Sequence, residues 1–386
     1  MAYPDEAIAR QIGDRVEAFV RDVVAPYERD PRLENHGPSE DLVKELRDKA
    51  RAAGVMTPHI LDDGSHLSQR GTAYVLQKTG LSPLGPVACN TGAPDEGNMF
   101  LLGKAATPEQ HERFLKPLVS GEARSAFFMT EPVDDNGAGS DPSMMKTTAK
   151  QDGNHWVING RKTFITGGMT SDFFVVGART GGDGLAGISL FFVETDTAGF
   201  SRSALNRKMG WWCSDQATLY FDDLRVPAEN LMGEQDLGFI AIMENFNLER
   251  VALIAGALGM MRVCLAESID WAQSRQTFGK PLIRHQVIRH KIADMSARID
   301  ALEAYLNQIC WIVNSGEMPV AEICKAKFFA TRALAFCASE AIQILGGAGY
   351  LRGNPVERIY REVKVMAIGG GSEEIMRDLA VRQMGL

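Results

Sequence analysis

Hydrophobic and polar positions follow different periods along this chain, and the changes of period divide it into three stretches. Up to about residue 125, apolar residues recur every three or four positions, which predicts amphipathic helices. Residues with this spacing near the start are Ile8, Ile12, Val16 and Phe19. A Gly/Pro-rich loop is expected over 85–97, and Thr107 followed by Pro108 is typical of a helix start.

Between about residues 125 and 226 the pattern changes to short β-rich runs separated by turn residues. Gly153, within an Asp-Gly-Asn sequence, and the pair Asn159-Gly160 are both typical of hairpin turns. The predicted runs cover 145–151, 155–159, 173–178, 187–194 and 218–221. About a hundred residues of this kind predict a small antiparallel barrel or sandwich.

From residue 238 onward the helical period returns and persists to the end of the chain. The predicted helices cover 239–274, 286–315, 319–345 and 372–384. Long helices joined by short links predict an antiparallel bundle. We therefore expect a multidomain α+β protein, divided at 1–125, 126–236 and 237–386 into helical, β and helical domains.

Composition limits the classes of function. The chain has 386 residues, 45% hydrophobic and 23% charged, which suits a globular protein of two or three domains. A net charge of −8 excludes an extended basic surface for nucleic acid. Residues 1–10 contain no apolar signal core, and no run of eighteen apolar residues occurs. We expect no membrane span and a cytoplasmic location, or the mitochondrial matrix if a transit peptide was removed.

Metal and disulfide chemistry are not expected. The six cysteines contain no Cys-x-x-Cys pair, and several lie in apolar runs where a thiol behaves as a small hydrophobe. His285 and His290 are not four residues apart, so they do not share one helix face as metal ligands would. The adjacent Trp211 and Trp212 are expected to pack between domains or to line a pocket.

Glu249 stands out because its neighbours on one helical stripe are all apolar. Those neighbours are Ile242, Phe246, Leu253 and Ala257. A carboxylate in such a place is either paired with a cation or has a raised pKa that suits a general base. From spacing alone, a structural ion pair in the core is the commoner outcome. Arg250 should point about a quarter turn away and need not neutralise Glu249.

Two glycine clusters, 346–349 and 369–371, adjoin predicted helices. Glycine permits close backbone approach, and a helix N-terminus favours phosphate, although bare turns explain such clusters equally well. The first cluster follows a helix rather than a strand, which excludes a nicotinamide-type dinucleotide fingerprint. The segment 275–280 ends a helix with cations that are favourable there in any case.

The order of several short segments is more specific than any one of them. They are Met129-Thr130-Glu131-Pro132 followed by 137–141, Phe164-Ile165-Thr166, Lys208-Met209-Gly210, Cys213-Ser214-Asp215, 226–230, 275–280 with His285-Gln286, 343–350 and Arg361-Glu362. In this order, over essentially the whole chain, they resemble the acyl-CoA dehydrogenase family. The resemblance implies an N-terminal helical domain, a central antiparallel β-barrel domain and a C-terminal four-helix bundle.

The resemblance also implies FAD between the β domain and the bundle. The residues implied to line it from the β domain are Phe128, Thr130, Ser140, Phe164 and Thr166. Those implied to reach the FAD of a neighbouring subunit are Arg275, Phe278 and Gln286, with Gln343, Gly346 and Gly347 on its adenosine diphosphate portion. Ser372 and Glu374 are implied to touch the same cofactor. Two departures affect these contacts: an insertion at 133–136, and Phe164 in place of the family's usual tryptophan.

The catalytic base differs from that of many family members, which carry a glutamate in a turn near the C-terminus. Gly370 occupies that place here, whereas Leu248-Glu249-Arg250 resembles the motif of the isovaleryl-type and long-chain-type members. The resemblance therefore implies Glu249 as the base, with Glu373 or Glu374 as the second choice. It also implies that the Gly370 N–H binds the thioester oxygen, and that Ser140, Asn247, Arg250 and Gly371 contact the acyl-CoA.

The implied reaction is oxidation of an acyl-CoA to a trans-2-enoyl-CoA, with a hydride passing to FAD and electrons leaving to an electron-transfer flavoprotein. A homo-oligomer, dimer or tetramer, is expected. Two other functions are weighed: an acyl-CoA oxidase or flavin monooxygenase on the same fold, and a flavin-free binding protein. Acyl chain length stays open, although small residues at 369–371 favour a bulky or branched chain.

Overall fold

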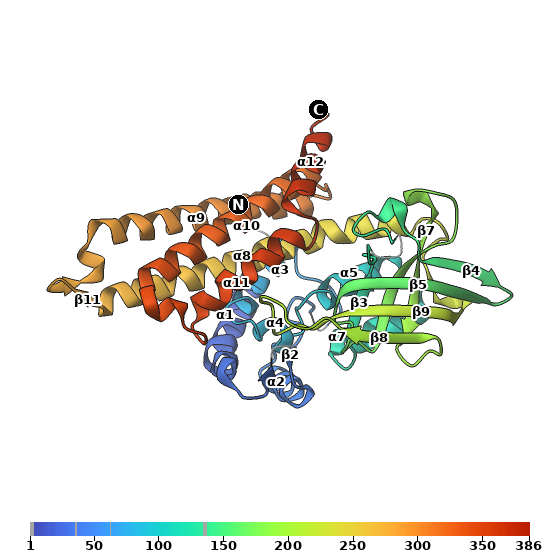
Figure 1. The fold of residues 1–386 in the computed structure, drawn as a ribbon, viewed down its shortest axis with the longest axis horizontal. Coiled ribbons are helices and arrows are strands. Elements are labelled where there is room, and N and C mark those ends of the chain that lie inside the picture. Colours follow the sequence, from blue (N-terminus) through green and yellow to red (C-terminus); the bar gives the residue numbers. More distant parts are fainter. Residues whose placement is uncertain (1–3, 35–36, 62, 134–136) are drawn as a thin grey trace.

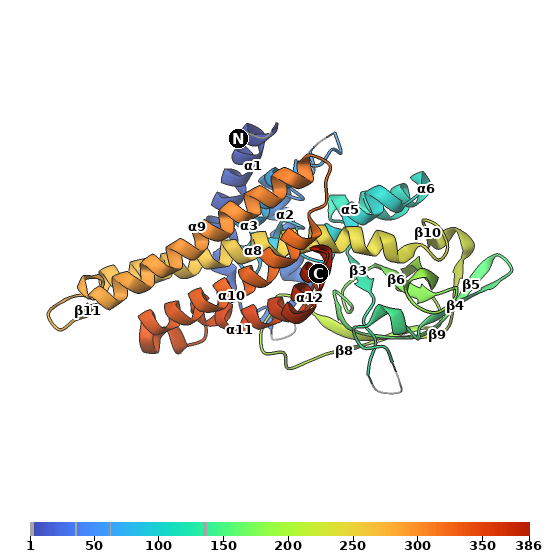
Figure 2. The same cartoon turned by 90° about the horizontal axis from the view of Figure 1, so that it is seen from above.

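The computed structural model describes residues 4–34, 37–61, 63–133 and 137–386. Helices from the two ends of the chain gather at one side of the molecule, and the β domain forms the other side (Figures 1 and 2). The long helix α8, Gly238–Ser274, begins beside the β domain and runs the length of the bundle. α8 therefore connects the two halves.

The N-terminal stretch is helical, as predicted. Its α-helices are α1 Glu6–Phe19, α2 Glu40–Ala52, α3 Gln69–Thr79, α4 Gly85–Ala88, α5 Asp95–Ala105, α6 Pro108–Gln110 and α7 Lys116–Ser120. Thr107 caps α6 through a reciprocal capping box with Gln110, which confirms the predicted helix start. The expected loop over 85–97 is wrong in part, because α4 lies inside it and α5 begins at its end.

The β domain is one eight-stranded sheet. Its strands are β3 Ser125–Phe128, β4 Thr148–Asp152, β5 His155–Thr166, β6 Phe173–Arg179, β7 Ile188–Glu194, β8 Phe200–Ala204, β9 Gln216–Pro227 and β10 Leu231–Met232. The expectation of a purely antiparallel sheet is wrong, because β6 pairs in parallel with β3 and β4. The barrel is not confirmed either: within the described residues the path ends at β10 and β8, which do not pair.

One of the two predicted hairpin turns is correct. β4 and β5 pair antiparallel around Gly153, which has a positive φ of 59°. Asn159-Gly160 instead lies inside β5, where the pairing with β9 slips between Ile158 and Gly160. A Cβ on Gly160 would lie 2.5 Å from Oγ1 of Thr147, so glycine is needed there for close packing and not for a turn.

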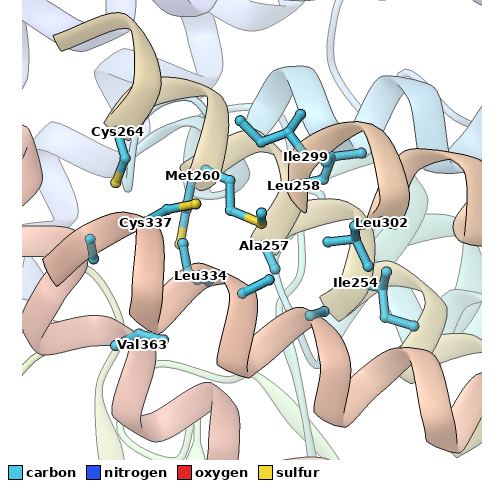
Figure 3. Packing of buried hydrophobic residues seen from close by; sticks show 14 of the residues in the cluster. Ile254, Ala257, Leu258, Met260, Cys264, Ile299, Leu302, Leu334, Cys337 and Val363 are labelled. Carbon is cyan, nitrogen blue, oxygen red and sulfur yellow. The ribbon is translucent and has the colours of Figure 1, made fainter. Parts of the chain in front are cut away.

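The C-terminal stretch forms the predicted helical bundle. Its other helices are α9 Gln286–Asn314, α10 Val320–Leu345, α11 Pro355–Ile368 and α12 Glu373–Gln383, and a small hairpin of β11 Gln276–Thr277 and β12 Lys280–Pro281 joins α8 to α9. Apolar side chains from α8, α9, α10 and α11 form one core (Figure 3). The sequence analysis did not single out α11, although Asn354 before Pro355 is a helix-start signal that it could have used.

Two described segments, α8 and 320–350, are long and apolar enough to cross a bilayer by composition. Half of the apolar window in each is buried inside the protein. In this bundle the apolar side chains of both segments contribute to the shared core, which accounts for their composition.

The tryptophan pair lies between domains, as one of its two interpretations expected. The ring of Trp212 lies between two guanidinium groups, 4.6 Å from Arg352 and 4.0 Å from Arg361. Arg361 also donates to the carbonyl of Met209 at 3.1 Å. These contacts tie the segment before β9 to α11 and fix the β domain against the bundle.

A buried ion pair organises the loop that follows β3. The carboxylate of Glu131 accepts hydrogen bonds from Nζ of Lys162 at 3.1 Å and from the backbone N–H groups of Ala138, Lys146 and Thr147. Burial alone would raise the pKa of Glu131, but the charge of Lys162 and the hydrogen bonds outweigh it and lower the pKa to about 2. This carboxylate therefore connects β5 to both ends of the loop.

Removing the cation should destabilise the β domain. In Lys162→Met, Glu131 keeps its backbone donors but stays charged and unpaired, so we expect a loss of about 3–5 kcal/mol, seen as a lower thermal unfolding midpoint. Lys150→Met, an exposed lysine on β4, is the matched control. Equal midpoints for the two variants would contradict the assignment.

Candidate active site

Glu249 lies on α8 where α5 crosses it, and the backbone of α5 lies directly against its carboxyl. A Cβ on Gly97 would be 2.3 Å from Oε1 of Glu249, so no other residue at 97 would leave the carboxyl where it is. Nδ2 of Asn245 donates to the same oxygen at 3.1 Å. No ion pair to Glu249 forms within the described part of the chain.

The electrostatics of Glu249 match those of a general base. Burial raises the pKa of Glu249 to about 7, and the hydrogen bond from Asn245 and the charge of Arg250 offset only part of that effect. The structural ion pair considered for this stripe is not formed, because Arg250 points elsewhere as expected: its guanidinium bonds to Gly370 and Asn247. The carboxyl can therefore exchange a proton near neutral pH.

A second carboxyl, which the sequence analysis missed, belongs to the same site. Glu96 precedes Gly97 on α5, and burial, followed by the charge of Glu249, raises the pKa of Glu96 to about 8. The two carboxyls therefore interact, and both have pKa values raised toward neutrality. It was missed because 85–97 was expected to be a loop, and only the packing of α5 on α8 encloses this side chain.

The turn 369–371 closes the site from the C-terminal side. A Cβ on Gly370 would lie 2.8 Å from Cδ1 of Leu253, which is one helical turn after Glu249 on the same face of α8. Gly370 and Gly371 have positive φ angles of 66° and 95°. Their N–H groups have no acceptor within the described chain, so both are available to a bound molecule.

Two expected substrate contacts have a different role. Asn247 is buried and its Oδ1 accepts from Nη1 of Arg250 at 2.9 Å, while Nε of Arg250 donates to the carbonyl of Gly370 at 3.0 Å. Both side chains are therefore occupied in holding the turn. Their direct contact with the acyl-CoA stays a prediction, and helix spacing alone could not show that Arg250 would also bind the turn.

The second-choice bases are less suitable. Glu373 accepts hydrogen bonds from Thr331, Arg332 and Arg377. Burial opposes these contacts, yet their sum lowers the pKa of Glu373, and the backbone at the start of α12 lowers that of the exposed Glu374. Acids with lowered pKa values are poor proton acceptors at neutral pH, so Glu249 stands alone among the three candidates.

The β-domain residues implied to line a flavin divide into two kinds. Phe164 is 70% exposed and is held at a positive φ of 58° beside a register shift in β5. A bulky side chain in that conformation is strained, and such strain is concentrated at functional sites. Thr130 and Thr166 are half-buried and Ser140 is exposed. These four therefore fit a surface for a planar cofactor.

Phe128 does not fit that surface through its side chain. Its ring is fully buried in the sheet core, 4.5 Å from the ring of Phe174. The alternation along β3 turns the ring inward, so the implied flavin contact of Phe128 stays a prediction that would involve its backbone. In the neighbouring insertion, residues 134–136 lie outside the described residues.

Of the remaining implied cofactor residues, Ser372 and Glu374 lie at the start of α12 beside the turn 369–371, and the others lie at the opposite end of the bundle. The hairpin that carries Phe278 projects there, far from the β domain (Figures 1 and 2). Phe278 is 97% exposed at a positive φ of 47°. The other exposed members of this group are Arg275, Gln286, Gln343, Gly346 and Gly347. One chain does not bring the two groups together.

Three family profiles match consecutive parts of the chain. Family profiles for the N-terminal, middle and C-terminal domains of acyl-CoA dehydrogenases match residues 7–122, 126–224 and 236–385. Cyclohexane-1-carbonyl-CoA dehydrogenase of Geobacter metallireducens is 35% identical over 285 residues, 74% of either chain.

Two solved structures are similar over nearly the whole chain. Butyryl-CoA dehydrogenase from Megasphaera elsdenii has a TM-score of 0.89 at 28% identity and covers 100% of both chains. A glutaryl-CoA dehydrogenase from Mycobacterium smegmatis in complex with FADH2 has a TM-score of 0.86 at 26% identity and covers 98% of this chain and 94% of that one.

Replacing Glu96 should make stability less dependent on pH. The folded-state pKa is raised from 4.5 to about 8, so between these values the folded protein holds a proton that the unfolded chain has lost. Stability therefore falls as pH rises through this window. Glu96→Gln should raise the unfolding temperature by a few degrees at pH 8 relative to wild type, and by less at pH 5.

The control for this comparison is Glu112→Gln, which changes a surface glutamate paired with Lys116. An unfolding temperature of Glu96→Gln that differs from wild type equally at both pH values would show that Glu96 ionises normally.

Proposed function

This chain belongs to the acyl-CoA dehydrogenase family, and from that premise we propose that Glu249 is the base of its reaction. The protein is an FAD-dependent oxidoreductase that dehydrogenates an acyl-CoA thioester. One observation carries the assignment of the base: the Glu249 carboxyl lies between α5 and α8, and no residue that the structure describes forms an ion pair with it. Its pKa near neutrality suits proton abstraction from a thioester-activated carbon.

The turn 369–371 supplies the complementary charge stabilisation. Negative charge develops on the thioester oxygen as the α-proton leaves, and fixed N–H donors stabilise it. The N–H of Gly370 is the proposed donor, with Gly371 beside it, while Glu249 takes the proton. Bound FAD supplies the acceptor for the hydride from the β-carbon, which gives a trans-2-enoyl-CoA.

Residues from two copies of the chain would hold FAD. Thr130, Ser140, Phe164 and Thr166 would contact it from the β domain, with Ser372 and Glu374 near the start of α12. The distant group of Arg275, Phe278, Gln286, Gln343, Gly346 and Gly347 would come from a second copy. This division supports a homo-oligomer, because the bundle separates the two groups within one chain.

Partners and substrate are proposed more broadly. Family members use acyl-CoA substrates and transfer electrons to an electron-transfer flavoprotein, and the same acceptor is proposed here, in the cytoplasm or the mitochondrial matrix. A branched or bulky acyl chain is proposed because glycines occupy 369–371. The similar cyclohexane-1-carbonyl-CoA dehydrogenase is consistent with such a chain.

Removal of the base should abolish turnover without removing the flavin. For Glu249→Gln, kcat should fall by roughly 10²–10⁴-fold, because amide nitrogen and oxygen do not accept the proton. The assay is an acyl-CoA panel with an artificial electron acceptor, with flavin absorbance as the loading check. In wild type, activity should rise with pH through about 7, where Glu249 ionises.

Glu244→Gln is the matched control, because Glu244 lies on the same helix and pairs with Lys104 at the surface. Full turnover by flavin-loaded Glu249→Gln would assign the base elsewhere.

Gly97→Ala tests the position of the same carboxyl without replacing Glu249. The added methyl group would occupy the place of Oε1 of Glu249, and this flexible side chain rather than backbone would have to move. We expect kcat to fall at least about tenfold while the fold and flavin are retained. Gly103→Ala is on the same helix with open space around its Cβ, and it should behave as wild type. Equal activities for these two alanine variants would be incompatible with the described contact.

A further inference from the structure

Two buried cations hold consecutive carbonyls of the turn 369–371. Nε of Arg250, from α8, donates to the carbonyl of Gly370 at 3.0 Å, and Nζ of Lys327, from α10, donates to the carbonyl of Gly371 at 2.6 Å. Lys327 is only 1% exposed. The sequence analysis did not consider Lys327, because a lysine on a long helix is usually at the surface.

Lys327 has no carboxylate to neutralise it within the described residues. Its one hydrogen bond is to the Gly371 carbonyl. Glu373, the nearest candidate on α12, is already bound by Thr331 and two arginines. Burial of an ammonium group without an ion-pair partner costs free energy. An uncharged side chain of similar size would fill the same space without that cost.

The two hydrogen bonds from Arg250 and Lys327 limit the directions in which the N–H groups of the turn can point. In a trans peptide the C=O of one residue and the N–H of the next residue belong to one planar unit and point in opposite directions. The bond from Arg250 therefore orients the N–H of Gly371, and the bond from Lys327 holds the peptide unit on the other side of Gly371. Fixing the carbonyls of Gly370 and Gly371 therefore restricts the dihedral angles of both glycines, which are otherwise the freest residues in the chain. The N–H groups of these glycines are the ones without an acceptor in the described chain.

We propose that Lys327 is a positioning residue: together with Arg250 it holds the turn 369–371 in the orientation in which the Gly370 and Gly371 N–H groups donate to the thioester oxygen. This inference rests on the proposed function of that turn. Lys327 does not touch the substrate in this arrangement. It acts through the backbone of Gly371, because the two peptide units that flank this glycine are held by Arg250 and by Lys327.

The charge of Lys327 should be lost at moderately alkaline pH. Burial and then the charge of Arg250 lower the pKa of Lys327 to about 8, against the opposing effects of Glu373, Cys324 and Glu374. A neutral amine is a weaker hydrogen-bond donor to the carbonyl. The kcat of wild type should therefore decline as pH rises through about 8.

Three variants separate a positioning role from a merely structural one. Lys327→Met removes the donor and should lower kcat by roughly 10–100-fold with less than about a threefold change in KM, somewhat less than the loss of an oxyanion donor itself. Lys327→Arg keeps the charge, so the alkaline decline should move up by at least about one pH unit. Lys325→Met, a lysine of the same helix paired with Glu322, is the matched control.

The decisive readout is the bond order of the bound carbonyl. The enoyl-CoA product of the best substrate, labelled with ¹³C at the thioester carbon, is bound to flavin-loaded protein and its carbonyl stretch is measured by infrared difference spectroscopy. Lys327→Met should shift this stretch to higher wavenumber than wild type and Lys325→Met, because the oxygen is less polarised. Lys327→Gln replaces Lys327→Met if the latter does not fold.

An unchanged carbonyl stretch and pH profile in folded Lys327→Met, with only a lower unfolding temperature, would overturn the proposal. So would an alkaline decline that persists in Lys327→Arg but disappears in Glu96→Gln, since Glu96 would then be the titrating group. Failure of the proposed function is distinct: wild type itself would not oxidise any acyl-CoA.

Discussion

The site depends on one constraint, the enclosure of the Glu249 carboxyl between two helices that offer it no cation. α5 approaches α8 so closely that only glycine fits at position 97. This approach removes water from the carboxyl and raises its pKa to about 7. Asn245 is a neutral hydrogen-bond donor to Glu249 and orients the carboxyl without neutralising it. Because α8 also contributes to the bundle core, the base is attached to a well-packed helix.

Local pattern predicted most of the elements, and non-local packing decided the rest. The periods of α8, α9, α10 and α12 were sufficient to place those helices within a few residues. The parallel pairing of β3 with β6 could not be read from either strand, since pairing partners lie far apart in sequence. Asn159-Gly160 has the composition of a turn, but Thr147, the residue before β4, fills the space beside Gly160. There tertiary contact outweighed the local preference.

The same division holds at the site. Glu249 was predictable because a charged residue on an apolar stripe is unusual within a single helix. Arg250 and Asn247 were assigned to the ligand from the resemblance, and the sequence could not show that Arg250 binds a turn 120 residues away while Asn247 binds Arg250. Glu96 and Lys327 look like ordinary surface residues on their own helices, and only the packing of α5 and of the turn 369–371 buries them. The roles of these charged residues depend on contacts with residues that are distant in the sequence.

The glycine at 370 and the glutamate at 249 are physically linked. A Cβ at 370 would lie 2.8 Å from Cδ1 of Leu253, which is one helical turn after Glu249, so a carboxylate at 370 would compete with this face of α8 for space. With glycine there, both cations bind carbonyls and orient the turn, while the acid lies on α8 where burial controls its pKa. The guanidinium of Arg250 follows Glu249 in sequence yet is already engaged by Asn247 and the turn. Because the base and the cations lie apart, Glu249 can be buried with a raised pKa while Arg250 and Lys327 are buried as cations.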